Sequence, residues 1–308
     1  MLVEAYNFVT PWAKAKKYQI IKNRILSKMV SGSYMLLHKV KHVKDNDNPK
    51  CDAVVSLTSF PARIDGLYYC LCSLLNQIVR PKRLVLWLAK EQFPNKLNSL
   101  PRRICELQDV GLEIKFCNDI KSYKKIVYMA QEAVNENIII VDDDTLYPED
   151  WLKRIWDEST RYPDSVICYR AHEIGIDNGI IEPYDKWNKL APGIKGPSKG
   201  LMPIGVGGVL YPKRCFENVE WDYNAIHKCA PTTDDIWLKC LITSRGYKII
   251  KVDADSVEWF TVLGTQKQRL AKMNVEMGNA NDIALKKCMQ YFGLIPADFS
   301  QSEMMHDK

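Results

Sequence analysis

The sequence predicts an α/β fold, in which a mostly parallel sheet carries helices on both faces. Apolar, β-branched segments alternate with segments of helical periodicity, and this unit repeats several times within residues 51–265. The composition, 46% hydrophobic and 26% charged, is that of an ordinary globular protein. A length of 308 residues suits two domains or one large α/β unit. We therefore expect an α/β domain over residues 51–265.

The elements of this domain follow one another in a regular order. Each expected strand is a short apolar run, and each expected helix places its apolar residues on one side. The strands are predicted at Asp52–Ser59, Arg83–Ala89, Gly111–Cys117, Asn137–Val141 and Ser165–Tyr169. The helices are predicted at Ile64–Ile78, Leu97–Asp109, Ser122–Val134 and from Thr233 to about Ser244. Residues 266–308 are expected to form a closing helix near Gln266–Tyr291 and a frayed tail from Asp298.

Positive charge is concentrated at the N-terminus. Residues 1–50 contain ten Lys and Arg against three Asp and Glu, whereas the rest of the chain contains 33 against 34. The formal net charge of +6 is therefore a property of the first segment. Because the remainder is almost neutral, charge does not indicate a nucleic-acid binder, and we expect no nucleic-acid partner.

Apolar residues are interleaved with these basic residues. Ile21, Ile25 and Met29 recur at helical spacing, which predicts a basic amphipathic helical segment within residues 1–50. Such a helix binds an anionic membrane surface, here through residues 1–44. The alternative is a helix that packs on the body or on a partner subunit, with its lysines in water. The sequence does not indicate an oligomeric state.

Other features concern the compartment. The sequence contains no run of about 18 apolar residues and no secretory signal, so we expect neither a transmembrane helix nor export. The ten cysteines are scattered and form no CxxC pair, which favours a reduced protein without a structural zinc site. Together with the basic segment, this predicts a cytoplasmic protein that is peripheral on the inner face of the cell membrane.

Polar loops follow three of the predicted strands. They span residues 58–63, 118–125 and 142–148. In a parallel sheet these loops share one edge, and ligands bind outside the carboxyl ends of the strands. No GxGxxG or GxxxxGK[ST] motif is present, so neither a dinucleotide fingerprint nor a P-loop accounts for them.

The third loop begins with three adjacent carboxylates, Asp142, Asp143 and Asp144. Like charges at contact distance cost on the order of 1–4 kcal/mol per pair near a protein surface. A divalent cation removes that cost and also binds phosphate oxygens. Strand alternation places Asp142 and Asp144 on one side and Asp143 on the other, where it would brace the loop. The alternative is that the carboxylates cap a helix starting near Pro148, but the buried strand before them favours a binding site.

A second acidic motif is Thr233-Asp234-Asp235-Ile236-Trp237-Leu238. Thr233 is placed to cap a helix that Gly246 ends, and two acids in a first helical turn are ordinary in such a position. The same pair would also suit a general base beside a cation-bound substrate.

These motifs together resemble those of GT-A-fold glycosyltransferases of the family 2 type, especially bacterial enzymes that build capsule or lipopolysaccharide chains. Residues 58–63 resemble the opening nucleotide-facing loop, and Asp142-Asp143-Asp144 resembles the DxD motif. Residues 233–238 resemble the TEDxxL-type motif, with Asp234 in place of the usual glutamate. The resemblance spans roughly residues 52–251 and implies a GT-A (Rossmann-like) catalytic domain.

The resemblance implies a role for each matching residue. A nucleotide-sugar donor, by family default a UDP-sugar, would be held by Thr58, Phe60, Arg63, Asp119, Lys125 and Asp142. Independently of the resemblance, Asp143, Gly207 and Gly208 are also candidates for the donor site. Asp144 would bind Mn²⁺ or Mg²⁺, and Asp235 would be the general base with Asp234 orienting the acceptor or sugar. The acceptor would be a glycan or a lipid-linked hydroxyl, and a single displacement would invert the anomeric carbon. Further metal ligands are unassigned, because Val257–Phe260 contains no histidine.

Three smaller features leave alternatives open. The glycines of residues 205–209 would let the backbone approach the donor sugar, or they form a tight bend before a strand. Arg170 and His172 would meet phosphate or acceptor, or they are structural. Residues 173–200, with Tyr184 and Trp187, suit an acceptor loop, or their aromatic side chains anchor the loop to the body.

Two other functions compete with transfer. Asp142-x-Asp144 after an apolar strand resembles the nucleophile motif of haloacid-dehalogenase-type phosphohydrolases, but that family carries it on the first strand. The chain would alternatively be a non-catalytic, glycosyltransferase-like subunit that binds nucleotide-sugar or glycan. The two acidic pairs argue against this alternative, because a binding module needs no base.

Overall fold

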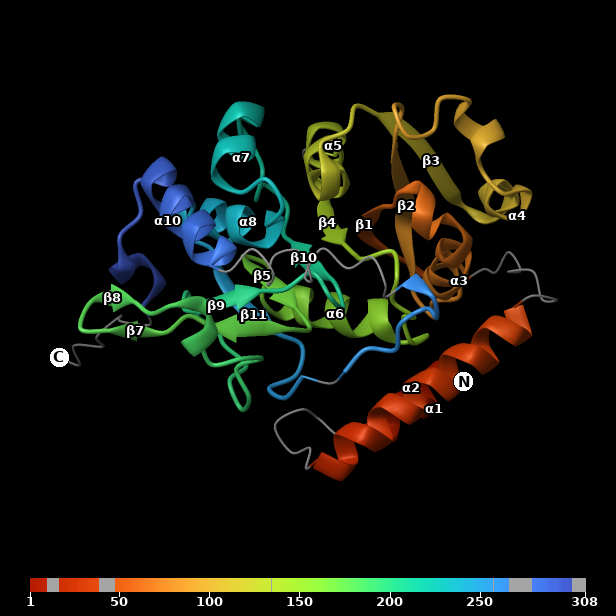
Figure 1. Ribbon diagram of the computed structural model, residues 1–308, viewed down its shortest axis with the longest axis horizontal. Coiled ribbons are helices and arrows are strands. Elements are labelled where there is room, and N and C mark those ends of the chain that lie inside the picture. Colours follow the sequence, from red (N-terminus) through yellow and green to blue (C-terminus); the bar gives the residue numbers. More distant parts are fainter. Residues whose placement is uncertain (10–16, 39–47, 134, 257, 266–278, 301–308) are drawn as a thin grey trace.

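A seven-stranded mixed sheet runs through the computed structural model, which describes residues 1–9, 17–38, 48–133, 135–256, 258–265 and 279–300 (Figure 1). The strand order is β11-β5-β10-β4-β1-β2-β3. Its strands are β1 (Lys50–Thr58), β2 (Arg80–Ala89), β3 (Leu112–Cys117), β4 (Asn137–Ile140), β5 (Ser165–Cys168), β10 (Val209–Tyr211) and β11 (Lys248–Lys251). β10 is antiparallel to both neighbours, while the other paired strands are parallel. The sheet is therefore mostly parallel, as predicted.

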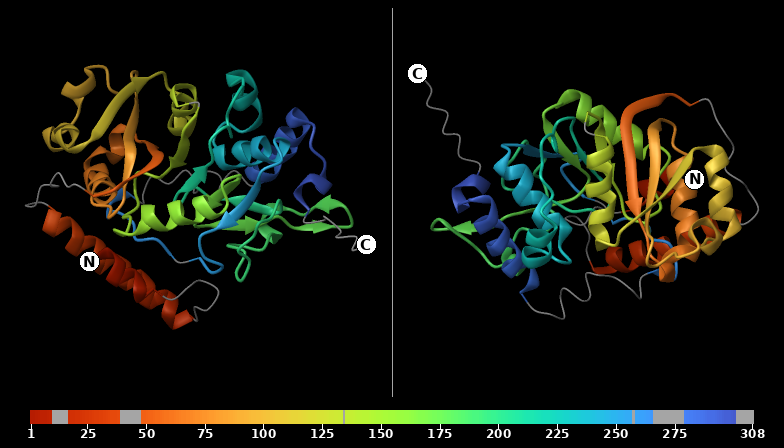
Figure 2. Two further views of the ribbon diagram at one scale, coloured as in Figure 1. Left: turned by 180° about the vertical axis from the view of Figure 1, so that it is seen from behind. Right: turned by 90° about the horizontal axis from the view of Figure 1, so that it is seen from above.

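Both faces of the sheet are covered by helices, which confirms that prediction (Figure 2). In β1, Ala53, Val55 and Leu57 enter one apolar core and Val54 enters the other. A strand buried on both faces needs a continuous apolar run rather than an alternating one. The first core includes α3 (Ile64–Leu75), α4 (Arg102–Cys105) and α6 (Trp151–Arg161). The second includes α5 (Lys124–Glu132), α7 (Tyr223–Cys229), α8 (Asp234–Ser244) and α10 (Ala280–Phe292).

The strand order changes direction beside β1. The chain moves outward from β1 to β2 and β3, and then returns to place β4 on the other side of β1. The segments that follow β1 and β4 therefore leave adjacent strands at one edge of the sheet. Such a switch point is where open α/β sheets bind ligands.

Residues 171–203 form two small antiparallel ribbons at one end of the molecule (Figure 1). β6 (Ala171–Glu173) pairs with β9 (Leu201–Pro203), and β7 (Ile176–Asp177) pairs with β8 (Ile180–Ile181). The predicted long loop thus contains short strands, and a helical turn at Tyr184–Lys186 lies between β8 and β9 in the sequence.

The N-terminal segment contains two helices, α1 (Leu2–Asn7) and α2 (Lys17–His38). The Tyr6 hydroxyl donates to the carbonyl of Leu146 at 2.9 Å and accepts from the amide of Phe260 at 2.7 Å. α1 is therefore fixed to the loop that follows Asp142–Asp144. α2 lies at the margin of the molecule (Figure 1), and within the described residues no helix has both the length and the hydropathy to cross a membrane.

Two helices expected in the first half of the chain differ in the structure. The helix expected at Leu97–Asp109 is instead three short turns at Lys96–Ser99, Arg102–Cys105 and Glu106–Val110. Pro101 breaks it, because proline forces the preceding Leu100 into an extended conformation. α3 ends at Leu75 rather than Ile78, and there the buried Gln77 side chain bonds to Ser73, Pro148 and Leu152.

The C-terminal prediction is also revised. α10 begins at Ala280, and residues 266–278 of the expected helix lie outside the described residues. The tail does not fray from Asp298, because Pro296–Phe299 forms a helical turn and Phe299 is buried in the second core. Residues 301–308 also lie outside the described part. All ten cysteines are free thiols in the structure.

Candidate active site

The loops after β1 and β4 are joined by the middle carboxylate of the acidic triplet. Asp143 accepts hydrogen bonds from the Ser59 hydroxyl and from Arg63 Nη1, each at 2.5 Å. Burial raises the pKa of the Asp143 carboxyl group, while Arg63 and Ser59 favour its charged form. Asp143 therefore braces the loop, as predicted. Its assignment to the donor site stays a prediction.

The outer carboxylates of the triplet contact two different basic side chains. Asp142 Oδ1 accepts from Lys125 Nζ at 2.9 Å. Asp144 Oδ2 lies 3.4 Å from Arg63 Nη2. Lys125 stands in the first turn of α5, where it is 5% exposed. A buried lysine needs such a partner, because an isolated ammonium ion loses its hydration there.

Lys125 also contacts the second acidic motif. Its Nζ lies 3.6 Å from Asp234 Oδ2 in the first turn of α8. Burial alone would lower the pKa of Lys125, but the carboxylates of Asp142, Asp234 and Asp235 raise it well above its usual value. Two motifs that are far apart in the chain therefore meet around one buried lysine.

Asp235 lies in a different environment from the other carboxylates. Its Oδ2 accepts from the backbone amide of Gly205 at 3.3 Å. Burial, followed by repulsion from Asp234, raises the pKa of Asp235 to about 7, although Lys125 acts in the opposite direction. A carboxylate with that pKa takes up a proton near neutral pH, which suits a general base.

Gly205 lies between the two motifs. A Cβ atom placed on it would stand 3.4 Å from Asp142 Oδ1, 3.5 Å from Asp235 Oδ1 and 3.6 Å from Lys125 Nζ. The two carboxylates therefore border the same short piece of backbone. Any larger residue at this position would enter the space between them.

The predicted donor-contacting glycines are accounted for by packing. Gly207 and Gly208 have φ values of +91° and +98°, and a Cβ atom on each would stand 2.6 Å from the Trp259 ring and 2.9 Å from the Trp151 ring. Trp151 Nε1 also donates to the Gly207 carbonyl at 2.6 Å. These contacts favour the tight bend over approach to a sugar, and contact with a donor stays a prediction.

The other predicted nucleotide-contacting residues lie along the same edge of the sheet. The Thr58 hydroxyl donates to the Trp87 carbonyl at 2.8 Å, and the Arg63 guanidinium lies 5.4 Å from the Phe60 ring centroid. Asp119 binds Lys124 Nζ at 2.6 Å and Gln92 Nε2 at 2.8 Å. The hydrogen bonds and ion pairs found among the described residues do not connect Asp119 to the two acidic motifs.

The predicted metal site has more acidic than basic side chains around it. The five carboxylates of residues 142–144 and 234–235 gather around two basic side chains, Arg63 and Lys125. In the described ranges, no three side chains of His, Cys, Asp or Glu are close enough to form a complete cation site. The arrangement still fits Mg²⁺ or Mn²⁺, because these ions bind through one or two carboxylates when substrate phosphates supply further oxygens.

The capping prediction for α8 needs a correction. Thr233 occupies the N-cap position, but its hydroxyl makes no cap hydrogen bond and is buried without a partner in the described structure. The helix start is instead held by backbone bonds from Ile236 and Trp237 to the Thr233 carbonyl.

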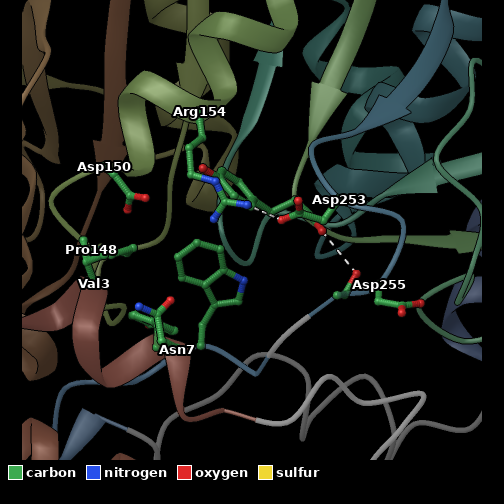
Figure 3. A pocket seen from close by; sticks show the side chains of 11 residues that line it. Val3, Asn7, Pro148, Asp150, Arg154, Asp253 and Asp255 are labelled. Carbon is green, nitrogen blue, oxygen red and sulfur yellow. Dashed lines mark hydrogen bonds and ion pairs between the residues drawn. The ribbon is translucent and has the colours of Figure 1, made fainter.

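A cavity of about 160 Å³ lies at the same edge of the sheet (Figure 3). Tyr169 and Asp253 line it just beyond the ends of β5 and β11, and Asp253 is paired with Arg154 of α6. Trp259 also lines the cavity and packs against Gly207. The cavity is therefore next to the 205–208 turn, although it does not include the five carboxylates.

The segment predicted to bind the acceptor lies close to the second motif. Burial is the main cause of the raised pKa of the Tyr184 hydroxyl, and the negative charge of Asp235 is the second cause. The two groups therefore lie within electrostatic reach of each other. Tyr184 also packs against His172 and Trp187, at centroid distances of 5.6 and 4.9 Å. His172 Nδ1 accepts from the Leu190 amide, so this histidine has the structural role that was the alternative interpretation.

Ser59, Gly205 and Trp259 had no individual role assigned from the sequence, although Ser59 lies within the predicted 58–63 loop and Gly205 is among the glycines of residues 205–209. Strand alternation could have indicated that Ser59 faces Asp143. The roles of Gly205 and Trp259 depend on contacts across the fold, for which the sequence carries no local signal.

Comparison with known proteins adds little to this geometry. No family model matches the sequence, and no curated protein matches it. Among solved structures, the chain is similar to a mannosyltransferase from Pyrobaculum calidifontis in complex with GDP-mannose and Mn²⁺. The TM-score is 0.49 at 14% sequence identity, over 88% of this chain and 81% of that chain. A similarity at this level does not identify the substrate or the reaction of this chain.

Proposed function

We propose that the protein is a metal-dependent glycosyltransferase that transfers a sugar from a nucleoside diphosphate donor to an acceptor hydroxyl. One observation carries the proposal. The two acidic motifs meet around Lys125, and they place a carboxylate with a pKa of about 7 beside carboxylates that are already paired with basic groups. The site therefore combines groups suited to binding charge with one group suited to moving a proton.

The donor side is assigned to the edge at β1 and β4. Arg63 and Lys125 would attract the diphosphate, and Asp142 and Asp144 would hold the cation that accompanies it. Mn²⁺ or Mg²⁺, when bound, supplies positive charge that stabilises the departing diphosphate. Asp143 fixes the loop through Ser59 and Arg63, so the flanking carboxylates keep their positions.

The acceptor side is assigned to Asp235. Its carboxylate would take the proton of the acceptor hydroxyl while that oxygen attacks the anomeric carbon. A new carbon–oxygen bond forms, the bond to the diphosphate oxygen breaks, and the nucleoside diphosphate leaves. Attack opposite the leaving group inverts the anomeric configuration. The Gly205 amide holds the carboxylate, and Asp234 positions the acceptor or sugar beside it.

The finer assignments follow the resemblance in sequence. A uridine diphosphate donor, a glycan or lipid-linked acceptor and a place in capsule or lipopolysaccharide synthesis on the cytoplasmic face of the membrane complete the proposal. Support for a saccharide acceptor comes from the aromatic group around Tyr184 and from the carboxylates and Trp259 of the neighbouring cavity. Aromatic faces and carboxylate oxygens suit the faces and hydroxyls of sugars.

A thermal-shift screen of UDP- and GDP-sugars, with Mn²⁺, Mg²⁺ or EDTA, tests the proposal. We expect stabilisation that needs both donor and metal, and then release of nucleoside diphosphate when an acceptor glycan is added. Binding without release would identify a non-catalytic binding subunit. Release of inorganic phosphate from sugar phosphates without an acceptor would identify a phosphohydrolase. Asp109→Asn, an exposed acid away from the site, serves as the control variant.

A further inference from the structure

The outer surface of α2 carries an apolar stripe. Six of the large apolar side chains of α2 are more than half exposed, and one of them, Leu37 (53%), lies off the stripe. The other five form it: Tyr18 (64%), Ile21 (52%), Ile25 (54%), Met29 (66%) and Leu36 (68%). Their spacings of three, four, four and seven residues place them on one side of the helix. Scattered exposed apolar residues are normal, but a row from Tyr18 to Leu36 along one helix marks an interaction surface.

Other side chains of α2 pack on the body: Tyr34 belongs to the first apolar core, and Leu26, Val30 and Met35 pack against that core. Asn23, Ser31 and Tyr34 are the most buried side chains of α2. The Ser31 hydroxyl donates to the Thr261 carbonyl at 2.8 Å. α2 is therefore packed on the body of the protein through its buried side chains, and this packing leaves the apolar stripe exposed to water.

Basic residues flank the stripe on both sides. At 100° per residue, Lys17, Arg24 and Lys28 lie along one flank and Lys22 lies along the other, and all four are exposed. The sequence of α2 contains no acidic residue. Cations beside a solvent-facing apolar stripe complement a surface that is negatively charged outside and apolar beneath.

We propose that the exposed face of α2 docks on an anionic lipid bilayer. The helix lies parallel to the bilayer, the stripe enters the boundary between headgroups and acyl chains, and the four basic side chains contact lipid phosphates. A second copy of this chain is a poorer occupant. Self-pairing of two such faces would bring basic flanks together with no acid on either helix.

The docked helix lies next to the proposed catalytic edge. Thr261, which Ser31 contacts, is bridged to Thr145, the residue that follows Asp144. A bilayer under α2 would therefore bring a lipid-linked acceptor to the side of the molecule that carries the two acidic motifs. Only this last step rests on the proposed function, since the docking surface itself is independent of the reaction.

Vesicle sedimentation of the full chain tests the proposal. We expect binding to phosphatidylcholine vesicles that contain phosphatidylglycerol, little binding to pure phosphatidylcholine, and a loss of binding as salt is raised. Lys22→Gln with Lys28→Gln should weaken binding about 30-fold, since each basic residue near an anionic surface contributes about fivefold. Ile25→Asp with Met29→Asp should remove binding. Ile180→Asp, which changes an apolar residue that is 70% exposed outside α2, should leave it unchanged.

Two results would overturn the proposal. One is equal binding to neutral and anionic vesicles by all variants. The other is a dimer in light scattering that Ile25→Asp with Met29→Asp converts to monomer, which would make a second copy the occupant. Metal-dependent donor stabilisation should be the same in the α2 variants and the native chain. Lost vesicle binding with transfer intact therefore separates this proposal from the proposed function.

Discussion

The two acidic motifs differ in how their charges are compensated. In residues 142–144, each carboxylate contacts a basic side chain, either Arg63 or Lys125. In residues 234–235, Asp235 is held by a backbone amide and has a pKa raised to about 7. The difference indicates a division of labour, because direct contact with a basic side chain favours the charged form of a carboxylate, whereas Asp235 exchanges a proton near neutral pH. Each prediction below alters one side of this comparison.

The largest effect is expected at Asp235. Asp235→Asn keeps the shape of the side chain but removes the group that accepts a proton, so turnover should fall about 10²- to 10⁴-fold. Donor stabilisation in thermal shift should persist, because the first motif is untouched. The check is the rate of nucleoside diphosphate release beside Asp109→Asn. A wild-type rate would exclude Asp235 as the base.

A change in the first motif should affect donor binding as well as turnover. Asp144→Ala removes a proposed cation ligand, so metal-dependent donor stabilisation should disappear and turnover should fall on the order of 10³-fold. Calorimetry of donor binding with and without Mn²⁺ measures the loss. If Asp144→Ala bound donor as the native chain does, the cation would have to be held elsewhere.

Lys125 connects the motifs, and its removal should lower stability. Lys125→Met leaves carboxylates of both motifs without their shared cation, which should cost about 3–5 kcal/mol in the free energy of unfolding. Lys124→Met is the matched control, since Lys124 is equally buried but contacts one partly exposed carboxylate, Asp119. Urea denaturation of both variants gives the comparison. Equal losses would mean that Lys125 has no special role between the motifs.

Local patterns predicted the sheet because its strands are buried on both faces. The apolar runs at β1 and β4 needed only their own sequence to be recognised. The bracing role predicted for Asp143 is confirmed, but Asp144 shares Arg63 with Asp143 while Asp142 contacts Lys125, so strict alternation does not describe the triplet. β10 is three residues long and enters the sheet between β4 and β5, which no local periodicity indicates.

Local sequence patterns also did not predict that Lys125 contacts both acidic motifs. Lys125 was predicted to hold the donor, and that contact stays a prediction. What the sequence did not indicate is that Lys125 pairs with Asp142 and lies near Asp234. Those contacts depend on how α5 and α8 sit at the edge of the sheet, which is a long-range property of the fold. The raised pKa of Asp235 follows from the same packing.

The turn at residues 205–208, which borders both acidic motifs, allows a test of the backbone that separates them. Gly207→Ala should lower stability by about 2–5 kcal/mol, because a Cβ atom at φ +91° would stand 2.6 Å from the Trp259 ring. Gly179→Ala, at φ +76° with no atom within 4 Å of its Cβ position, should lose only about 1 kcal/mol. Thermal unfolding distinguishes the two. Equal losses would show that backbone strain, and not ring packing, requires the glycine.

The smallest effect concerns the pH dependence of the second motif. Transfer by the native chain should decline as pH falls below about 7, because Asp235 then becomes protonated. Asp234→Asn removes a neighbouring negative charge, so the pKa of Asp235 should fall and the acidic limb of kcat/KM should move down by about one unit, worth about 1.4 kcal/mol.

Stability should change in the same variant with a defined sign. Because the folded pKa of Asp235 lies above its ordinary value of 3.8, the folded state binds more protons between about pH 4 and 7, and native stability decreases as pH rises through that window. Asp234→Asn should flatten this decrease, because in the variant the folded pKa of Asp235 lies closer to its unfolded pKa. Parallel pH profiles of rate and Tm measure both effects. An acidic limb that does not move would assign the titration to a group other than Asp235, and the contrast between the motifs would then rest on contacts alone.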